Sequence, residues 1–255
     1  MLFFTDLDKT IVYSGYPEHY CVEYKEKQEI TYMTNEAKRQ MDNLFKKKGF
    51  RMIPCTLRSF EQTKRIEFIT DVLTPVVICD NGFSIYQKGV LDKSWDNKMQ
   101  SYIVKYPMSE TYKAIDDFIT TANIPISQIK SNRDAFFTVI FNSITDAEYF
   151  SDKIIDKVDL SLYKIEKQGR KLYIIPDFLN KVLALRYVKS QFTDELVVTA
   201  GDSDVDMAFV IEGEIAILPG HSKLNINKAI KTSSKGIDAG KEILEVIYKL
   251  IQKQI

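Results

Sequence analysis

Two aspartates that stand two residues apart follow the first apolar segment of the chain. Leu2–Thr5 is followed directly by Asp6, Leu7 and Asp8. In an extended segment alternate side chains point the same way, so Asp6 and Asp8 can face one site while Leu7 stays in the hydrophobic layer. Neighbouring carboxylates repel each other, and a bound divalent cation relieves that repulsion. Because oxygen ligands suit the hard ion Mg²⁺ better than zinc, the pair indicates a Mg²⁺ site.

Three other places in the chain offer side chains that suit the same chemistry. A β-branched run at 196–200 leads into a second acidic cluster, Gly201–Asp206, and a short apolar run at 52–55 leads into Thr56 and Arg58. Lys181 begins a helix-like segment. Sites in open α/β sheets form beyond the carboxyl ends of the strands, so we expect these residues to share one crevice. Arg58 either binds substrate there or forms an ion pair at the rim.

This ordered set resembles the motifs of the haloacid dehalogenase (HAD) superfamily. The matching positions are Asp6–Thr10, Thr56, Lys181 and Gly201–Asp206, and together they span the chain. The resemblance implies a Mg²⁺-dependent phosphatase, a phosphoric monoester hydrolase that works through an aspartyl-phosphate. It makes Asp6 the nucleophile and has Thr56 and Lys181 grip the phosphoryl group.

The resemblance also implies the remaining roles. Asp8 acts as general acid and base, and Arg58 is a further candidate for binding substrate. Four carboxylates are candidate ligands for Mg²⁺: Asp6, Asp8, Asp202 and Asp206. Two positions depart from the Cof-type pattern, since Leu57 replaces a glycine and Val205 replaces an asparagine.

Asp204 is an additional carboxylate in the second acidic cluster. It either compensates for the polar side chain missing at Val205 or caps the loop. Turn preferences favour the capping role.

We expect an α/β fold, a doubly wound and mostly parallel sheet like the Rossmann-like HAD core, with an inserted α+β cap. The core comprises 1–82 and 179–255, and 83–178 forms a cap that resembles the C2 type of Cof-type sugar phosphatases and sucrose-phosphate phosphatase. In the core, a helix is predicted from about Thr34 to Lys48, and Ser59 with Gln62 forms a capping box for the next helix. The elements expected in the cap are strands at 83–86, 136–141, 161–166 and 171–175, a helix near 109–121, and a helix from Thr145 with Glu148 as its capping partner.

The charge, cysteine content and apolar runs of the chain limit which kinds of partner are expected. The chain has 255 residues, of which 35 are basic and 35 acidic, so an electrostatically driven nucleic-acid partner is not expected. Its three cysteines show no metal-ligand spacing, which indicates reduced thiols and a cytoplasmic location. No apolar run approaches the ~20 residues needed to cross a bilayer, so no membrane association is expected.

Three functions fit these residues. The leading one is hydrolysis of a small phosphorylated metabolite, a sugar phosphate, because a large cap can close over a small ligand and exclude water. A phosphomutase would use the same aspartyl-phosphate but return it to a sugar hydroxyl. A phospho-receiver-like signalling domain also combines carboxylates, Mg²⁺, Thr and Lys, although its acceptor lies in a later strand and it lacks a cap.

Overall fold

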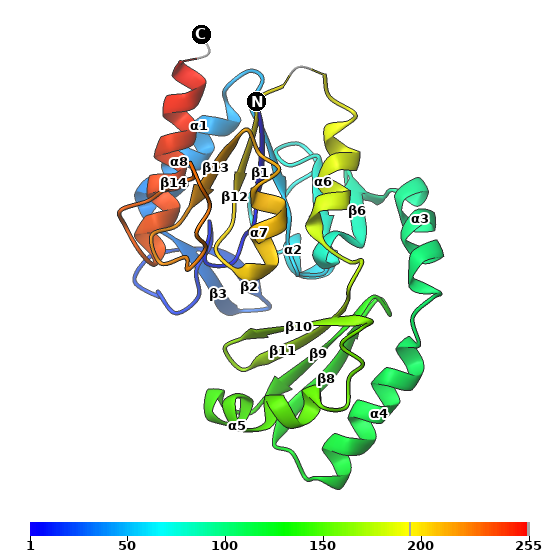
Figure 1. Ribbon diagram of the computed structural model, residues 1–255. Helices are drawn as coiled ribbons and strands as arrows, with labels where there is room; N and C mark the ends of the chain where they lie inside the picture. Colours follow the sequence, from blue (N-terminus) through cyan, green and yellow to red (C-terminus); the bar gives the residue numbers. More distant parts are fainter. Residues whose placement is uncertain (194, 254–255) are drawn as a thin grey trace. The chain divides into compact units, whose positions relative to one another are not determined.

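The computed structural model describes residues 1–193 and 195–253 (Figure 1). The chain forms two compact units. The core unit comprises Met1–Asp92 and Asn180–Ile255, and the inserted unit comprises Lys93–Leu179. The insertion therefore begins about ten residues later than the predicted boundary at 83.

A five-stranded parallel sheet forms the centre of the core unit. Its strand order is β14-β13-β12-β1-β4, and every neighbouring pair is parallel. This confirms the predicted doubly wound α/β fold. The strands are β1 (Leu2–Thr5), β4 (Arg51–Pro54), β12 (Val197–Ala200), β13 (Ile215–Leu218) and β14 (Ile230–Lys231).

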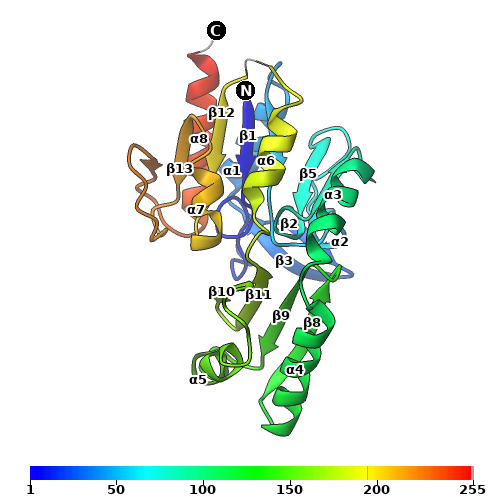
Figure 2. The same ribbon diagram turned by 45° about the vertical axis from the view of Figure 1, so that its right-hand side comes forward.

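Helices cover both faces of this sheet. Helices α1 (Asn35–Phe45) and α8 (Ile237–Gln252) lie on one face, and α6 (Lys181–Lys189) and α7 (Asp204–Val210) lie on the other (Figures 1 and 2). Successive strand residues point to opposite faces, so Phe3 packs in the same cluster as α1 and α8 while its neighbours point away from them. Burial on both faces explains why Leu2, Phe3 and Phe4 are apolar in succession rather than alternating with polar residues.

Local capping determines where the core helices begin. The Thr34 hydroxyl accepts a hydrogen bond from the Ala37 amide at 3.0 Å and starts α1, as predicted, although the helix ends at Phe45. Ser59 and Gln62 form the predicted capping box at the start of α2 (Phe60–Thr63). Each cap satisfies backbone N–H groups that the first helical turn leaves without partners.

Two small antiparallel sheets complete the core unit. One is a ribbon of β2 (Tyr20–Lys25) and β3 (Gln28–Met33). The other contains β5 (Val76–Cys79), β6 (Ser84–Gln87) and β7 (Val90–Leu91). The sequence pattern assigned the segment 83–86 to the cap. It belongs to the core because β6 folds straight back onto β5 across the turn η1 (Asp80–Gly82).

The inserted unit is an α+β structure, as predicted. Its antiparallel sheet has the order β10-β11-β9-β8, and α4 packs on it through the Tyr112 and Phe137 rings, whose centroids are 5.4 Å apart. Helix α5 begins at Ile144 and is capped by Ser143 with Asp146, one residue before the predicted start. Helix α3 and strand β8 were not predicted. The elements are α3 (Lys93–Ile103), α4 (Met108–Thr121), β8 (Ile126–Asn132), β9 (Phe136–Phe141), α5 (Ile144–Ile155), β10 (Tyr163–Gln168) and β11 (Lys171–Pro176).

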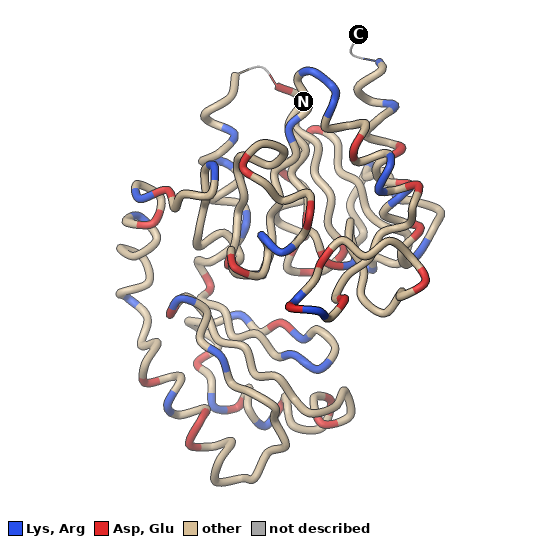
Figure 3. Tube along the Cα trace, turned by 180° about the vertical axis from the view of Figure 1, so that it is seen from behind, with Lys and Arg blue, Asp and Glu red and all other residues tan. Residues whose placement is uncertain are grey.

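Charged side chains of both signs are distributed along each unit (Figure 3). Among the residues that the structure describes, no helix is both long and apolar enough to span a membrane.

The turn after β5 brings the chain unusually close to the start of α6. Asp80, Asn81 and Gly82 all have positive φ, at 51°, 57° and 93°. A Cβ atom on Gly82 would lie 2.6 Å from the carbonyl oxygen of Asn180, the residue that caps α6. Only glycine permits this approach, so Gly82 lets Lys181 sit where it does.

We therefore expect Gly82→Ala to displace the first turn of α6 and to destabilise the protein by about 2 kcal/mol more than Gly49→Ala. Gly49 is the matched control, because its φ of 81° carries similar strain but its added Cβ would meet nothing within 4 Å. Urea unfolding of the two variants measures the difference. Equal losses would show that the approach to Asn180 does not constrain the fold.

Candidate active site

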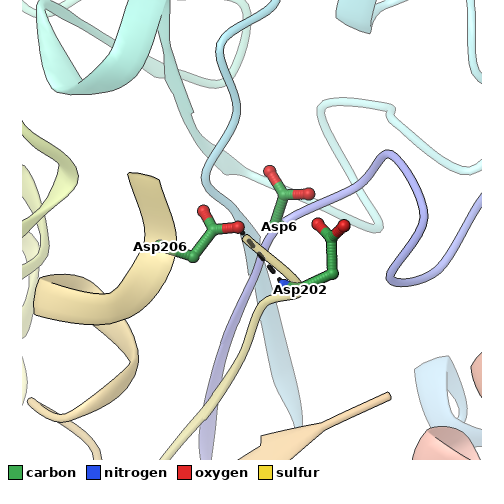
Figure 4. Close-up of side chains that lie close together, drawn as sticks. All are labelled: Asp6, Asp202 and Asp206. Atoms are coloured by element: carbon green, nitrogen blue, oxygen red, sulfur yellow. Dashed lines mark hydrogen bonds between the residues drawn. The ribbon is translucent and has the colours of Figure 1, made fainter. Parts of the chain in front are cut away.

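Three carboxylates meet at the carboxyl edge of the central sheet. Asp6 follows β1, Asp202 follows β12, and Asp206 lies on α7; one oxygen from each lies within 4.8 Å of the others (Figure 4). Asp206 is 1% exposed and Asp6 is 7% exposed. The parallel pairing of β1 and β12 brings together residues almost two hundred positions apart, because the carboxyl ends of the two strands lie at one edge of the sheet.

Lys181 supplies the positive charge among these carboxylates. Its Nζ donates to Asp6 Oδ1 at 2.7 Å and to Asp206 Oδ1 at 2.6 Å, and its side chain is 1% exposed. Burial alone would lower the pKa of this ammonium group, but Asp206 and Asp6 outweigh burial and raise the pKa. Lys181 is therefore held charged at the start of α6, next to Asp6.

Asp206 holds the acidic loop in shape. Its Oδ2 accepts hydrogen bonds from the Ser203 hydroxyl at 2.8 Å, the Ser203 amide at 3.2 Å and the Asp202 amide at 3.3 Å, the last drawn in Figure 4. Gly201 is required there, because a Cβ at that position would lie 2.6 Å from Asp206 Cβ. Both oxygens of Asp206 are thus already bound, one to Lys181 and one to the loop.

Asp202 is the carboxylate of this group that is best placed to bind a cation. Its Oδ1 is buried and has no hydrogen-bond partner among the described residues. Burial first, and then the charge of Asp206, raise the pKa of Asp202 to about 7. The pKa of Asp6 is also raised well above its usual value, mainly by burial. A buried, orphaned carboxylate oxygen beside a second carboxylate fits a hard divalent cation such as Mg²⁺.

Asp204 and Val205, whose roles in the acidic loop were left open by the sequence, do not belong to this group of three carboxylates. Asp204 is exposed in the first turn of α7, where a negative charge favours the helix dipole, and the N-cap itself is Ser203. Val205 follows on the same helix and is partly buried. Asp204 is therefore not among the three carboxylates that converge.

Thr56 sits in the loop after β4, beside the next strand. Its amide donates to Ile78 O at 3.0 Å, and its carbonyl accepts from the Asn81 amide at 3.0 Å. The side-chain oxygen accepts from the Arg58 amide at 3.1 Å. A hydroxyl that accepts one hydrogen bond still has its proton to donate, so Thr56 can bind an anion from a fixed position.

Asp8 turns its carboxylate toward Arg58. Two parallel bonds join them, from Nε to Oδ2 at 2.7 Å and from Nη2 to Oδ1 at 2.6 Å. Of the two roles open to Arg58, the structure shows the ion pair. The carboxylate of Asp8 does not belong to the three-carboxylate group, although it was a candidate ligand for Mg²⁺.

One charged residue of this region, Glu23, was not predicted from the sequence. It lies on β2, is completely buried, and accepts a bond from Arg58 Nη1 at 2.7 Å. No motif includes Glu23, and its neighbours in the ribbon are a mixture of apolar and charged residues, so no local pattern distinguishes it from a solvated strand residue.

Comparison with known proteins places this site in a family. The model of the sucrose-6F-phosphate phosphohydrolase family matches residues 1–240. The chain belongs to this family. Its members are phosphatases of the HAD superfamily, so the predicted superfamily and the prediction of a phosphoric monoester hydrolase are confirmed. A search of curated proteins gave no match.

Solved structures share the fold over nearly the whole chain. A sucrose-phosphatase from Synechocystis, solved with sucrose and phosphate, has a TM-score of 0.62 and 16% identity, and covers 98% of this chain and 97% of its own. A trehalose-6-phosphate phosphatase related protein has a TM-score of 0.63 and 16% identity, with 100% of both chains covered. A HAD subclass IIB sugar phosphatase has a TM-score of 0.64 and 13% identity, with 98% of both covered.

If Asp202 is a ligand for a metal cation, metal binding should raise the free energy of unfolding of the protein. At pH 8, where Asp202 is ionised, Mg²⁺ at 100 times its Kd should add about 2.7 kcal/mol to the free energy of unfolding of chelator-treated protein. Asp202→Asn removes the orphaned charge, so the metal-free variant should melt above metal-free wild type and lose most of the Mg²⁺ response. Thermal melting with and without Mg²⁺ measures both effects.

Asp204→Asn is the control for this measurement, because it makes the same change to an exposed carboxylate of the same loop. It should retain the wild-type response. A Mg²⁺ response that survives in Asp202→Asn would contradict the assignment of Asp202 as a ligand.

Proposed function

We propose that this protein is a Mg²⁺-dependent phosphatase that hydrolyses a small phosphorylated metabolite, a sugar phosphate, through a phosphorylated Asp6. One observation carries the proposal: the ammonium group of Lys181 is buried between Asp6 and Asp206, and these two carboxylates converge with Asp202, which has a buried oxygen without a partner among the described residues. The cluster combines a nucleophilic carboxylate with a fixed cation and a site for a second cation.

The proposed chemistry needs this concentration of charge. Phosphate monoesters are among the slowest compounds to hydrolyse unaided, and acceleration depends on electrostatic support for the transferring phosphoryl oxygens. Lys181 and the Thr56 hydroxyl supply that support from rigid positions. Lys181 also holds Asp6 in place through Oδ1, which fixes the direction from which this carboxylate can attack phosphorus.

Mg²⁺ would be held by Asp6 and Asp202, with Asp206 fixing the loop that carries Asp202. When bound, the ion neutralises charge on the phosphoryl oxygens and brings them to the nucleophile. Asp206 was also a candidate ligand, but its two oxygens are occupied by Lys181 and by the loop. Its proposed part is therefore to orient rather than to coordinate.

Asp8 is the proposed general acid and base. It gives a proton to the leaving oxygen as Asp6 is phosphorylated, and it takes a proton from the water that later cleaves the aspartyl-phosphate. The two bonds from Arg58 hold its carboxyl group at the rim of the site. We propose that Arg58 orients Asp8, in place of the substrate-binding role considered for it from the sequence.

The substrate class rests on the family and on the inserted unit. The matching family is named for sucrose 6F-phosphate, and inserted units of this kind can control which small substrates reach a catalytic core. A panel of sucrose 6F-phosphate, trehalose 6-phosphate, glucose 6-phosphate and p-nitrophenyl phosphate, assayed for free phosphate with Mg²⁺, tests the class. A phosphomutase would instead release isomerised sugar phosphate and little free phosphate.

A cytoplasmic location also belongs to this proposal. Cys21, Cys55 and Cys79 are buried free thiols. Free thiols are typical of proteins that work in a reducing compartment.

Asp6→Asn should abolish turnover while leaving the fold intact. The amide keeps the shape of the carboxyl group but can neither attack phosphorus nor carry charge to a metal, so we expect a loss of about 10⁴-fold or more in kcat. Phosphate release and circular dichroism, measured together, separate lost chemistry from lost structure. Phosphate release at the wild-type rate would end the assignment of the nucleophile.

The inserted unit should choose the substrate while the core unit performs the chemistry. Asp92 is tied to α6 by a 3.1 Å bond from Tyr187, so a linker of about ten Gly/Ser residues can replace Lys93–Leu179. The shortened protein, once shown to be folded, should hydrolyse p-nitrophenyl phosphate but lose its preference among sugar phosphates. Undiminished selectivity in the shortened protein would contradict this division of labour.

A further inference from the structure

Glu23 is a fully buried charge that none of the steps above uses. Its Oε1 accepts two bonds from Arg65, at 2.9 and 2.7 Å, and its Oε2 accepts from Arg58 Nη1 at 2.7 Å and from the Thr31 hydroxyl at 3.1 Å. The side chain is 0% exposed. A carboxylate is costly to bury unless it is paired and hydrogen-bonded. Glu23 meets both conditions, because two arginines and the Thr31 hydroxyl donate to it.

Arg58 links this buried charge to the active site. Its guanidinium group is planar, with one edge bound to Asp8 through two bonds and the remaining nitrogen bound to Glu23. Burial alone would lower the pKa of Arg58, but Asp8 and then Glu23 raise it. Because the fork is rigid, fixing the nitrogen on Glu23 also fixes the edge that holds Asp8.

The four charges of this network balance. Asp8 and Glu23 carry two negative charges, and Arg58 and Arg65 carry two positive charges. Arg65 lies next to Ile66, which forms an antiparallel bridge with Glu23, so the ribbon presents the carboxylate to both guanidinium groups. Glu23 thereby accepts the bond from Nη1 of Arg58, and Asp8 accepts the bonds from the other two nitrogens.

We propose that Glu23 is a positioning residue for phosphoryl transfer: it anchors Arg58, and Arg58 sets the carboxyl group of Asp8. This inference rests on the proposed function, since it concerns the step in which Asp8 gives up its proton. In that step the bond from phosphorus to Asp6 forms, and the bond to the leaving oxygen breaks. Asp8, which is ionised in this network, first takes up a proton from solvent as the phosphate dianion arrives, and this costs one of its two bonds from Arg58. The leaving oxygen then keeps the electron pair and takes that proton.

The leaving group provides a readout that a merely structural role would not change. p-Nitrophenolate is a weak base and departs without a proton, whereas phenolate, whose conjugate acid has a pKa of about 10 like tyrosine, benefits from one. The two phosphate esters have nearly the same shape. The ratio of their kcat/KM values therefore reports how well Asp8 serves the leaving oxygen up to the phosphorylation of Asp6.

We expect Glu23→Gln to lower kcat/KM for phenyl phosphate by about tenfold and for p-nitrophenyl phosphate by less than about threefold. Glu195→Gln is the matched control. Like Glu23, Glu195 is a carboxylate paired with an arginine, Arg51 at 2.7 Å, although it is only partly buried; it belongs to no part of the proposed machinery. It should leave the ratio unchanged.

A second variant is needed in case Glu23→Gln misfolds, because that substitution leaves the guanidinium groups of Arg58 and Arg65 with one carboxylate, Asp8, between them. The double variant Glu23→Gln with Arg65→Gln restores charge balance while Arg58 still lacks its anchor. It should fold, by circular dichroism, and show the same selective loss on phenyl phosphate.

These measurements distinguish failure of the positioning role of Glu23 from failure of the proposed function. Equal losses on both esters, in either variant, would overturn the positioning role of Glu23 and leave the phosphatase assignment standing. A wild-type protein that hydrolyses neither ester with Mg²⁺ would instead contradict the proposed function itself.

Discussion

The ammonium group of Lys181, buried between Asp6 and Asp206, is the interaction on which the rest of the site depends. It joins the end of β1, the start of α6 and the first turn of α7 through bonds of 2.7 and 2.6 Å. Removing one partner of a buried ion pair typically costs 3–5 kcal/mol, so none of the three elements can shift independently. One ammonium does not balance three carboxylates, and the excess negative charge is what suits the site to a metal cation.

The geometry around this pair depends on close approaches that few side chains would allow. Gly82 lets the turn after β5 pass against Asn180, and Gly201 lets the acidic loop pass against Asp206. At the rim, Arg58 joins Asp8 to the buried Glu23. The site therefore has two parts, a carboxylate cluster around Lys181 and a guanidinium network around Arg58. We propose that the first supports phosphoryl transfer and that the second orients the proton donor.

Much of this could be predicted from local pattern. Mostly apolar runs that end in carboxylates marked β1 and β12, and Ser59 with Gln62 marked a helix start, because capping is a local interaction. The rest depended on how the segments pack. The turn at Asp80–Gly82 is local, but the pattern of 84–87 did not show that this segment pairs back onto β5 instead of leaving the core. Glu23 is buried because two arginines more than thirty residues away surround it, and nothing in its neighbouring residues encodes that contact.

The central claim is that Asp6 carries the phosphoryl group during turnover, and trapping that intermediate tests it most directly. Wild-type protein and Asp8→Asn would be mixed with p-nitrophenyl phosphate and Mg²⁺, quenched in acid and reduced with borohydride, which converts a phosphorylated aspartate to homoserine. Mass spectrometry of the peptide Met1–Lys9 should then place homoserine at position 6, with more of it in Asp8→Asn because water is activated poorly there. Rapid phosphate release with Asp6 unmodified in both proteins would contradict the account.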